Sequence, residues 1–302
     1  MKIIVTHASP DWDAITSVWL IKKYLPGWQD AAVQFVPAGE RCKGANVQSI
    51  DAIERIGGDE VIHVDTGLGP LDHHQTASDQ VCGASLTWDF VRGELEKQGE
   101  KLTDEHREAV TRIVRVVVAI DHFKEVFWPD AVADYQEFSL FGILEGLKYE
   151  KPDADAYFVD FGMLCLNFVL ADFENRIWAE KEIKEKGIQF ETRYGKGLGF
   201  ETLNDTVLKL SQKMGYILVV RKDPRKGYVR IKALPEEKQE TRSKKQGVDL
   251  TLIYEQLKKI DPDATWFLHV SKKMLLNGSP KNPKMRATKL SLSEIIKVLE
   301  RI

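Results

Sequence analysis

The sequence of 302 residues is poor in cysteine and has no long apolar run. Cys42, Cys82 and Cys165 are far apart and form no Cys-x-x-Cys pair, which argues against a disulfide framework and against a thiolate zinc site. The opening MKIIVTH is too short for a secretory signal, and the roughly eighteen uninterrupted apolar residues of a membrane span do not occur. We therefore expect a cytoplasmic protein without a membrane partner.

The composition, with 43% hydrophobic and 29% charged residues, is that of a globular protein long enough for two domains. The net charge of −3 conceals a strong asymmetry. Residues 1–190 contain 19 Lys and Arg against 33 Asp and Glu, whereas residues 191–302 contain 24 against 13. An acidic half suits divalent metals and a basic half suits phosphate-bearing ligands, although both could simply be solvated faces.

The first 125 residues alternate short apolar runs with helical patterns, which is typical of an α/β domain with a parallel sheet and helices on both faces. Gly57-Gly58 would end the second helix of this series. The expected strands are 2–7, 32–36 and 60–65, and the expected helices are 12–25, 49–56, 84–98 and 104–121.

Residues 130–190 have apolar positions at helical spacing, and the pattern changes near Gly187. We assign residues 1–187 to the first domain, with a helical connector over about 150–187, and residues 188–302 to a smaller, mixed α/β domain. In the second domain we expect strands at 198–203, 216–223, 227–234 and 265–271, helices at 250–260 and 290–302, a hairpin turn at 221–227, and a mobile surface loop at 235–247.

The first group of chemically suggestive residues follows the first predicted strand. His7, Asp11 and Asp13 offer one imidazole nitrogen and two carboxylates within seven positions. This donor set suits manganese, magnesium or iron, and loops at the carboxyl ends of parallel strands are where such sheets bind ligands. Asp11 could alternatively act only as the N-cap of the following helix.

The second group follows the third predicted strand. Asp65 ends that strand and Asp72, His73 and His74 come soon after it. Because Asp65 should lie at the same sheet edge as His7, its carboxylate could bridge two metal ions. An adjacent pair of histidines alone would be weak evidence, but the preceding aspartates strengthen it.

The segments THASPDWDAITS, VDTG, LDHHQ and AIDHF resemble, in order, the motifs of the DHH phosphoesterase superfamily. That superfamily includes RecJ-type exonucleases, oligoribonucleases and manganese-dependent inorganic pyrophosphatases. The resemblance implies that His7 and Asp11 hold one metal ion, that Asp13, His73 and Asp121 hold a second, and that Asp65 bridges both. It also implies that His74 faces the substrate phosphate or leaving oxygen as a donor or general acid, and that Asp72 orients a ligating histidine.

The last part of the chain lacks the Gly-rich loop of a typical DHH protein and instead resembles the MYG-type (melanocyte proliferating gene) exonucleases. FLHVS and LLNGS echo that family's segments, and Gln75 matches its DHHQ motif. Backbone N–H groups of a tight turn, together with nearby cations, could hold a phosphate. The candidate substrate-binding residues are His269, Ser271, Asn277, Gly278, Ser279, Lys284 and Arg286, with Lys281 and Lys289 as further cations.

Together these features predict a metal-dependent phosphoesterase that binds two divalent ions, with manganese favoured over magnesium or iron. Its expected substrates are short RNA or DNA oligonucleotides or nucleotides, because no ladder of basic and aromatic residues suited to a long strand is evident. The metal ligands do not encode the leaving group, so a pyrophosphatase or phosphomonoesterase is an alternative. A catalytically inactive nucleotide-binding or nucleic-acid-binding module is another, and a homodimer is compatible with the sequence.

Overall fold

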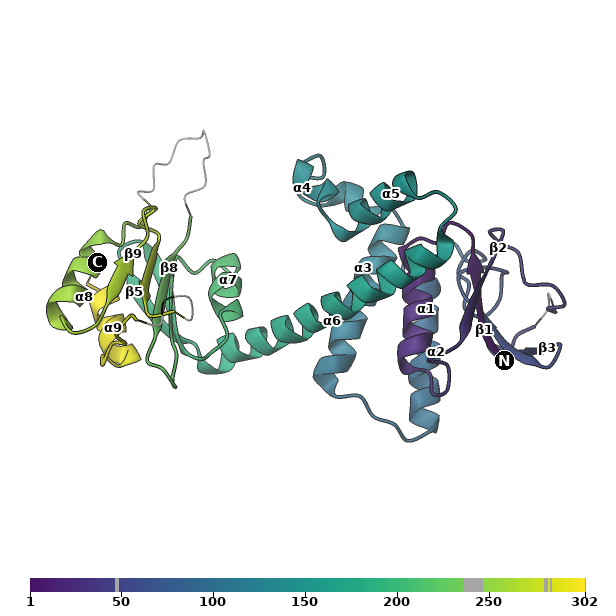
Figure 1. Ribbon diagram of the computed structural model, residues 1–302, viewed down its shortest axis with the longest axis horizontal. Helices are drawn as coiled ribbons and strands as arrows, with labels where there is room; N and C mark the ends of the chain where they lie inside the picture. The colour runs from purple at the N-terminus through teal and green to yellow at the C-terminus, as the bar shows by residue number, and fades with distance from the viewer. Residues whose placement is uncertain (47–48, 236–246, 280–281, 283, 302) are drawn as a thin grey trace. The chain divides into compact units, whose positions relative to one another are not determined.

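The computed structural model describes residues 1–46, 49–235, 247–279, 282 and 284–301. The chain divides into two compact units, Met1–Glu174 and Asn175–Ile302, each with its own sheet (Figure 1). The division falls inside the long helix α6 (Asp155–Lys186), whereas the change in sequence pattern falls at its end, where strand β5 begins at Ile188. The protein is therefore mixed α/β in both units.

The first unit is built on a four-stranded sheet in the order β2-β1-β4-β3. Strands β2, β1 and β4 are mutually parallel, as the sequence predicts, and β3 joins the edge antiparallel to β4. Its elements besides α6 are β1 (Lys2–His7), α1 (Trp12–Tyr24), β2 (Ala32–Val36), β3 (Glu54–Ile56), β4 (Asp59–His63), α2 (Gly83–Lys97), α3 (Asp104–Asp121), the 3₁₀ helix η1 (Lys124–Phe127), α4 (Asp134–Glu137) and α5 (Leu140–Glu150).

The helix predicted over 49–56 is wrong, because its last residues form strand β3. Gly57 and Gly58 both have positive φ, +59° and +94°, and turn the chain directly into β4. Two successive residues with positive φ are typical of a tight hairpin turn rather than of a helix end. Glu54 is buried in the resulting hairpin, so tertiary packing overrides the helical spacing of the apolar residues.

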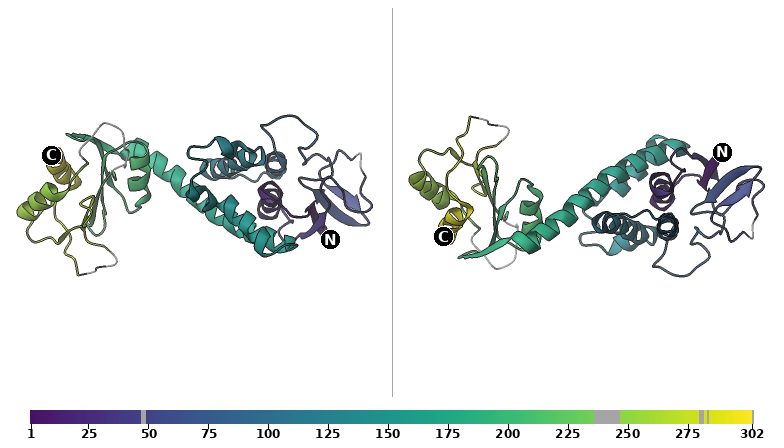
Figure 2. Two further views of the ribbon diagram at one scale, coloured as in Figure 1. Left: turned by 90° about the horizontal axis from the view of Figure 1, so that it is seen from above. Right: turned by 90° about the horizontal axis from the view of Figure 1, so that it is seen from below.

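The prediction of helices on both faces of this sheet is also wrong for the described residues. Helices α1, α2 and α3 lie on one side of it (Figures 1 and 2). The opposite face has a small cluster of Val5, Val36 and Val61, packed against Ile3, Cys42 and Ile56. Cys42, in the segment after β2, thus packs on the face where a helix was expected.

Helix α1 is buried on nearly all sides, which fixes the residues at its start. The Asp11 side chain caps it by accepting hydrogen bonds from the backbone N–H groups of Asp13 and Ala14. Helix α6 packs closely on α1, because a Cβ atom at Gly162 would lie 2.5 Å from Ile15. α6 is also, among the described helices, the one long and apolar enough to cross a membrane, a property that core helices share.

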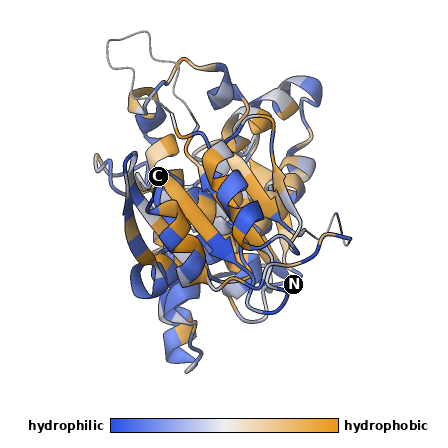
Figure 3. Cartoon of the chain, turned by 90° about the vertical axis from the view of Figure 1, so that its left-hand side faces the viewer, coloured by the Kyte–Doolittle hydropathy of each residue, from blue (hydrophilic) through white to orange (hydrophobic). Residues whose placement is uncertain are grey.

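The second unit has a six-stranded sheet in the order β5-β6-β7-β8-β10-β9. Helices α8 and α9 pack on one apolar face, and α7 with the end of α6 packs on the other. Figure 3 shows apolar residues concentrated in the strands and mixed colours on the helices, as expected for elements buried on one side. Its elements are β5 (Ile188–Thr192), β6 (Gly195–Glu201), α7 (Thr206–Lys213), β7 (Leu218–Lys222), β8 (Val229–Ala233), α8 (Thr251–Ile260), β9 (Trp266–Leu268), β10 (Met274–Asn277) and α9 (Leu292–Leu299).

The predicted hairpin turn at 221–227 is confirmed, because β7 and β8 pair antiparallel and the Asp223 N–H donates to the Tyr228 carbonyl at 2.7 Å. The sequence did not predict β5, β10 or α7. The strand predicted over 265–271 ends at Leu268. Most of the loop predicted as mobile at 235–247 lies outside the described residues.

Candidate metal centre

The carboxyl ends of β1 and β4 bring His7 and Asp65 together. His7 is the last residue of β1, and Asp65 follows β4, which is the parallel neighbour of β1. Asp11 and Asp13 lie at the start of α1, which begins a few residues after His7. The edge of the sheet therefore carries four of the candidate residues, as the sequence predicts.

His7, Asp11 and Asp65 form the first group of donors. The His7 Nε2 atom lies 3.3 Å from Asp65 Oδ2 and 3.8 Å from Asp11 Oδ2. The other oxygen of Asp11 accepts the two capping hydrogen bonds of α1. Asp11 therefore caps the helix and also faces His7, so the capping role and the site role are compatible.

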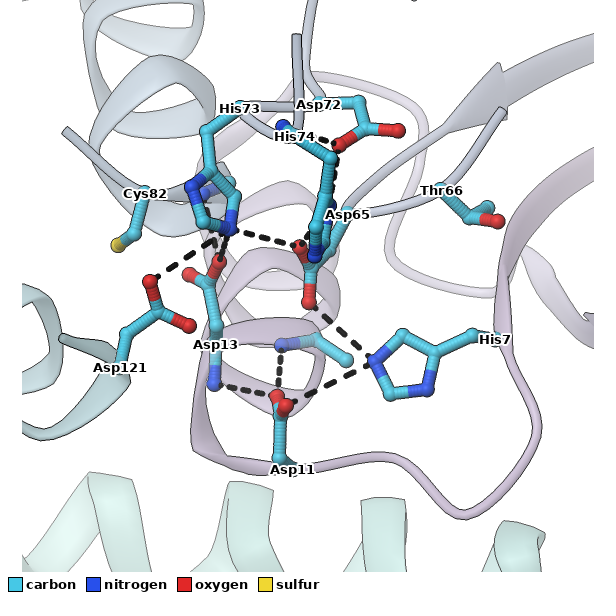
Figure 4. Close-up of polar contacts among 12 residues, drawn as sticks. His7, Asp11, Asp13, Asp65, Thr66, Asp72, His73, His74, Cys82 and Asp121 are labelled. Atoms are coloured by element: carbon cyan, nitrogen blue, oxygen red, sulfur yellow. Dashed lines mark hydrogen bonds and ion pairs between the residues drawn. The ribbon is translucent and has the colours of Figure 1, made fainter. Parts of the chain in front are cut away.

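His73 is at the centre of the second group. Its Nε2 atom lies 3.7 Å from Asp13 Oδ2, 3.6 Å from Asp65 Oδ1 and 3.5 Å from Asp121 Oδ2 (Figure 4). Asp121 ends helix α3, so this group draws on two helices and two loops. Asp65 directs one oxygen toward each group, because Oδ2 faces His7 and Oδ1 faces His73.

Three buried atoms in the second group have no hydrogen-bond partner: His73 Nε2, Asp65 Oδ1 and Asp121 Oδ2. Buried polar atoms are normally paired, so these three need an explanation, and the two carboxylate oxygens each lie within 3.6 Å of His73 Nε2. Asp65 and His73 with His74, and His73 and Asp121 with His122, are groups whose donor atoms lie close enough together to bind a cation, and imidazole with carboxylate oxygens is a suitable ligand set for one. The site thus contains buried Asp and His groups that could hold a metal ion.

Without a cation, ionisation of the buried carboxylates in this site is unfavourable. Burial, and then the neighbouring carboxylates, raise the pKa of Asp13 well above its usual value and that of Asp65 to about 9. Burial also raises the pKa of Asp121, against the opposing effect of His73. Burial lowers the pKa of His73, which favours the neutral ring that a metal requires.

Asp72 and His74 form a hydrogen-bonded pair beside this centre. His74 Nδ1 donates to Asp72 Oδ1 at 2.7 Å, while the His74 side chain is 59% exposed. Burial opposes ionisation of Asp72, but hydrogen bonds from His74 and from the Leu68 backbone N–H outweigh it and lower the pKa of Asp72. Asp72 therefore holds the His74 ring, and the Nε2 atom of that ring is free of this bond.

The start of helix α2 is a part of the site that the sequence did not reveal. The backbone N–H groups of Gly83 and Ala84 each donate to the Asp13 carboxylate at 2.6 Å. The positive end of a helix favours such a carboxylate. The Cys82 thiol lies beside this carboxylate and slightly lowers the pKa of Asp13, against the larger effect of burial. Nothing in a lone Cys-Gly pair before a helical pattern signals this contact.

The three histidines without an assigned role lie in different surroundings. His122 is next to the centre, where its Nε2 donates to the Val81 carbonyl at 2.8 Å and its ring is 5.7 Å from that of His73. His63 is buried on β4, and burial with the nearby Arg41 charge lowers its pKa to about 4. His106 lies away from the centre, hydrogen-bonded to Tyr24 and Glu174.

In the second unit, His269 and Ser271 lie in the turn between β9 and β10 rather than on a strand. The Ser271 hydroxyl is 2.8 Å from His269 Nδ1. Asn277 is at the other end of β10, so the structure does not gather the predicted substrate-binding residues at one place. The turn forms there because the His269 carbonyl accepts the Lys272 N–H and Lys272 adopts a positive φ of 56°.

Asn277 is completely buried, and its side chain holds the segment that follows it. Its amide donates to the carbonyls of Thr265 and Arg286, and its oxygen accepts the Thr288 N–H at 2.7 Å. Gly278 has a φ of +79°, and a Cβ atom there would lie 2.0 Å from the Tyr228 ring. Both residues thus shape the loop from within.

The outer part of that loop is more accessible. Lys284, Arg286 and Lys289 are exposed, whereas Ser279 is only partly exposed and pairs with Asn282 in an isolated bridge. Lys281 lies outside the described residues. The loop therefore presents cations to solvent while Asn277 anchors it below.

Comparisons with known proteins add little to this geometry. No family model matches the chain, and no curated protein matches it. Fifteen chains of solved structure match. One of them, from the crystal structure of an uncharacterized protein from Helicobacter pylori G27, is 11% identical, with a TM-score of 0.25 and coverage of 100% of this chain and 99% of that chain. The resemblance to the DHH superfamily therefore rests on the sequence motifs.

Proposed function

We propose that the protein is a two-metal phosphoesterase. The observation that carries the proposal is the position of Asp65, whose two carboxylate oxygens face two different groups of donors. His7, Asp11 and Asp65 would hold one divalent ion, and Asp13, Asp65, His73 and Asp121 would hold the other. Manganese fits this nitrogen and oxygen donor set best, with magnesium and iron as alternatives.

The divalent ions that these residues would hold would supply positive charge for a phosphate ester and an activated water. The chain's own residues would orient and protonate the substrate. His74 is the exposed donor beside the centre, and Asp72 fixes the orientation of its ring. His74 is therefore the residue placed to donate to a phosphate oxygen or to the leaving group.

The proposed substrate is a short oligonucleotide or a nucleotide, cleaved at a phosphodiester bond in the manner of an exonuclease. The excess of cations after residue 190 and the exposed Lys284 and Arg286 support a polyanionic ligand. Support also comes from the resemblance to the DHH and MYG-type families.

Two other functions use the same residues. The donor groups are equally suited to hydrolysis of pyrophosphate or of a phosphomonoester, because they contact the phosphate and not the leaving group. A nucleotide-binding module without turnover would keep the fold, but it would not need a complete donor set with three unpaired buried atoms.

A substrate panel tests these functions against one another. Protein purified with manganese should release mononucleotides from short RNA or DNA, and Asp65→Ala and His73→Ala should abolish the release. Asp30→Ala, at an exposed position on the same unit, is the matched control and should leave activity unchanged. Activity that survives both site substitutions would rule out the two-metal mechanism. Pyrophosphate turnover with inert oligonucleotides would select the first alternative, and tight binding without any turnover would select the second.

A further inference from the structure

A buried ion pair lies under the loop that follows Asp65. Arg41 and Glu54 pair directly, and their side chains are 6% and 7% exposed. His63 completes the cluster, with its Nδ1 3.3 Å from the Glu54 carboxylate and its Nε2 accepting the Cys42 N–H at 3.1 Å. Glu54 lies on β3, His63 on β4 and Arg41 in the segment after β2. The cluster therefore joins that segment to the β3–β4 hairpin, whose second strand leads to Asp65.

The Arg41 side chain is in direct contact with the backbone of the loop. Its Nη1 atom donates to the Gly67 carbonyl at 3.0 Å. A Cβ atom at Gly67 would lie 2.5 Å from Arg41 Cγ, and one at Gly69 would lie 2.9 Å from Arg41 Nη1. The two glycines therefore let the loop rest on the guanidinium group and its stem.

The loop held in this way has an unfavourable backbone conformation at the residue proposed to bridge two metals. Asp65 has a φ of +51°, and Leu68 has a φ of +52°. Residues other than glycine adopt this strained region only where the surroundings impose it. The same loop continues to Asp72, which accepts the Leu68 N–H at 2.7 Å. This one loop therefore connects Asp65 to Asp72 and to the histidines that follow it.

Stability alone is a weak reason for a charged pair at this place. The free energy lost by removing two charges from water is about as large as the free energy gained from their attraction. Apolar residues of similar volume therefore often stabilise a fold equally well. The planar guanidinium, in contrast, can donate to Glu54 and to the Gly67 carbonyl in fixed directions at the same time. A group with this geometry is suited to fixing a backbone.

We infer that Arg41, supported by Glu54 and His63, is a positioning group that holds the Asp65 carboxylate where it can bridge two metal ions. This inference rests on the proposed function and names a residue outside the ligand set. Residues that orient metal ligands typically change metal affinity by about 10- to 100-fold when they are replaced.

The test compares manganese binding by three variants with that of the unaltered protein. Arg41→Lys keeps the charge but cannot reproduce the two directed bonds. The double variant Arg41→Met/Glu54→Gln leaves no unpaired charge, so it tests the same point if the fold tolerates lysine poorly. Arg55→Met is the matched control, because Arg55 lies on the same hairpin with its side chain 84% exposed.

Manganese affinity is measured by titration, and the EPR spectrum of the bound ions reports their magnetic coupling through a shared carboxylate. Arg41→Lys and the double variant should bind manganese at least about tenfold more weakly and lose or alter the coupled spectrum, while Arg55→Met should match the unaltered protein. A role in stability only would lower the melting temperature without changing the affinity or the spectrum of the folded protein, and that result would overturn the inference.

These binding measurements, combined with the substrate panel, separate this inference from the proposed function. Coupled manganese binding that depends on Arg41, in a protein that hydrolyses no phosphoester, would support the inference and overturn the enzymatic proposal. Hydrolysis and coupled binding that are unaffected by Arg41→Lys and by the double variant would support the enzymatic proposal and overturn the inference. An unaltered protein that binds no divalent ion would overturn both.

Discussion

Gly83 leaves no room for a side chain beside Asp65, because a Cβ atom at position 83 would lie 2.9 Å from the Asp65 Cβ and 3.2 Å from its Cα. It would also lie 3.0 Å from Asp13 Oδ2. A side chain here must displace either the Asp65 carboxylate, which faces both donor groups, or the Asp13 carboxylate, which accepts the N–H groups of Gly83 and Ala84 at the start of α2. The start of α2 is therefore coupled to the metal centre through a contact between two backbones.

Gly83→Ala should consequently weaken manganese binding by about 10- to 100-fold and cost about 1–3 kcal/mol of stability through overpacking. The control is Gly93→Ala, in the same helix, where a new Cβ meets nothing within 4 Å. That change should raise stability by about 0.5–1 kcal/mol and leave metal binding unchanged. Thermal melts and manganese titrations distinguish the two, and equal affinities for both variants would contradict the prediction.

Asp65→Asn should stabilise the protein in the absence of metal while abolishing metal binding. The pKa of Asp65 is raised to about 9 from its ordinary value of 3.8. Between these values the native state keeps a proton that the unfolded chain has lost, so the stability of the metal-free protein falls as the pH rises from about 4 to 9. The slope contributed by this group reaches about 1.4 kcal/mol per pH unit.

Urea unfolding of the metal-free protein at several pH values measures this slope. Asp65→Asn should flatten the curve between about pH 4 and 9 and raise the unfolding midpoint at pH 8, whereas Asp30→Asn at an exposed position should follow the unaltered protein. Manganese should restore stability at high pH only where Asp65 is present. A steeper loss of stability in Asp65→Asn than in the unaltered protein would refute this account.

His74→Ala should lower kcat by about 100- to 10,000-fold, as expected for the loss of a positioned proton donor. Metal content should stay the same, because the ring is 59% exposed and its Nδ1 is engaged by Asp72. Asp72→Asn should lower kcat less, since the ring remains in place with a weaker partner. Metal analysis beside the kinetics is decisive here: loss of an ion in His74→Ala would make His74 a ligand instead of a donor.

Asn277→Ala should destabilise the second unit by about 1–3 kcal/mol, because the buried Thr288 N–H and the Thr265 carbonyl lose their hydrogen bonds to the Asn277 side chain. Lys284→Ala, on the exposed part of the same loop, should leave stability unchanged and weaken binding of an oligonucleotide, with a smaller effect at high salt. Calorimetry and binding titrations at two salt concentrations check both. Unchanged stability in Asn277→Ala would remove the anchoring role assigned to that side chain.

Local pattern predicted much of the first unit. The alternation of apolar runs and helical spacing located β1, β2, β4 and helices α1 to α3, and a parallel arrangement of strands necessarily brings their carboxyl ends to one edge. His7 and Asp65 could be placed together for that reason. The failure at residues 49–56 has the same origin, since apolar spacing cannot distinguish a short helix from a strand that pairs through a Gly-Gly turn.

The order of the motifs, with His7 and Asp65 at strand ends, thus predicted which residues could form a metal centre: His7, Asp11, Asp13, Asp65, His73 and Asp121. Only the folded chain decided how Asp65 divides its oxygens, which backbone groups hold Asp13, and that Arg41 lies under the loop. It also separated His269 from Asn277 by the length of β10. These relationships arise from contacts between residues distant in sequence, and no local preference of Gly83 or Arg41 encodes the partner that packing gives it.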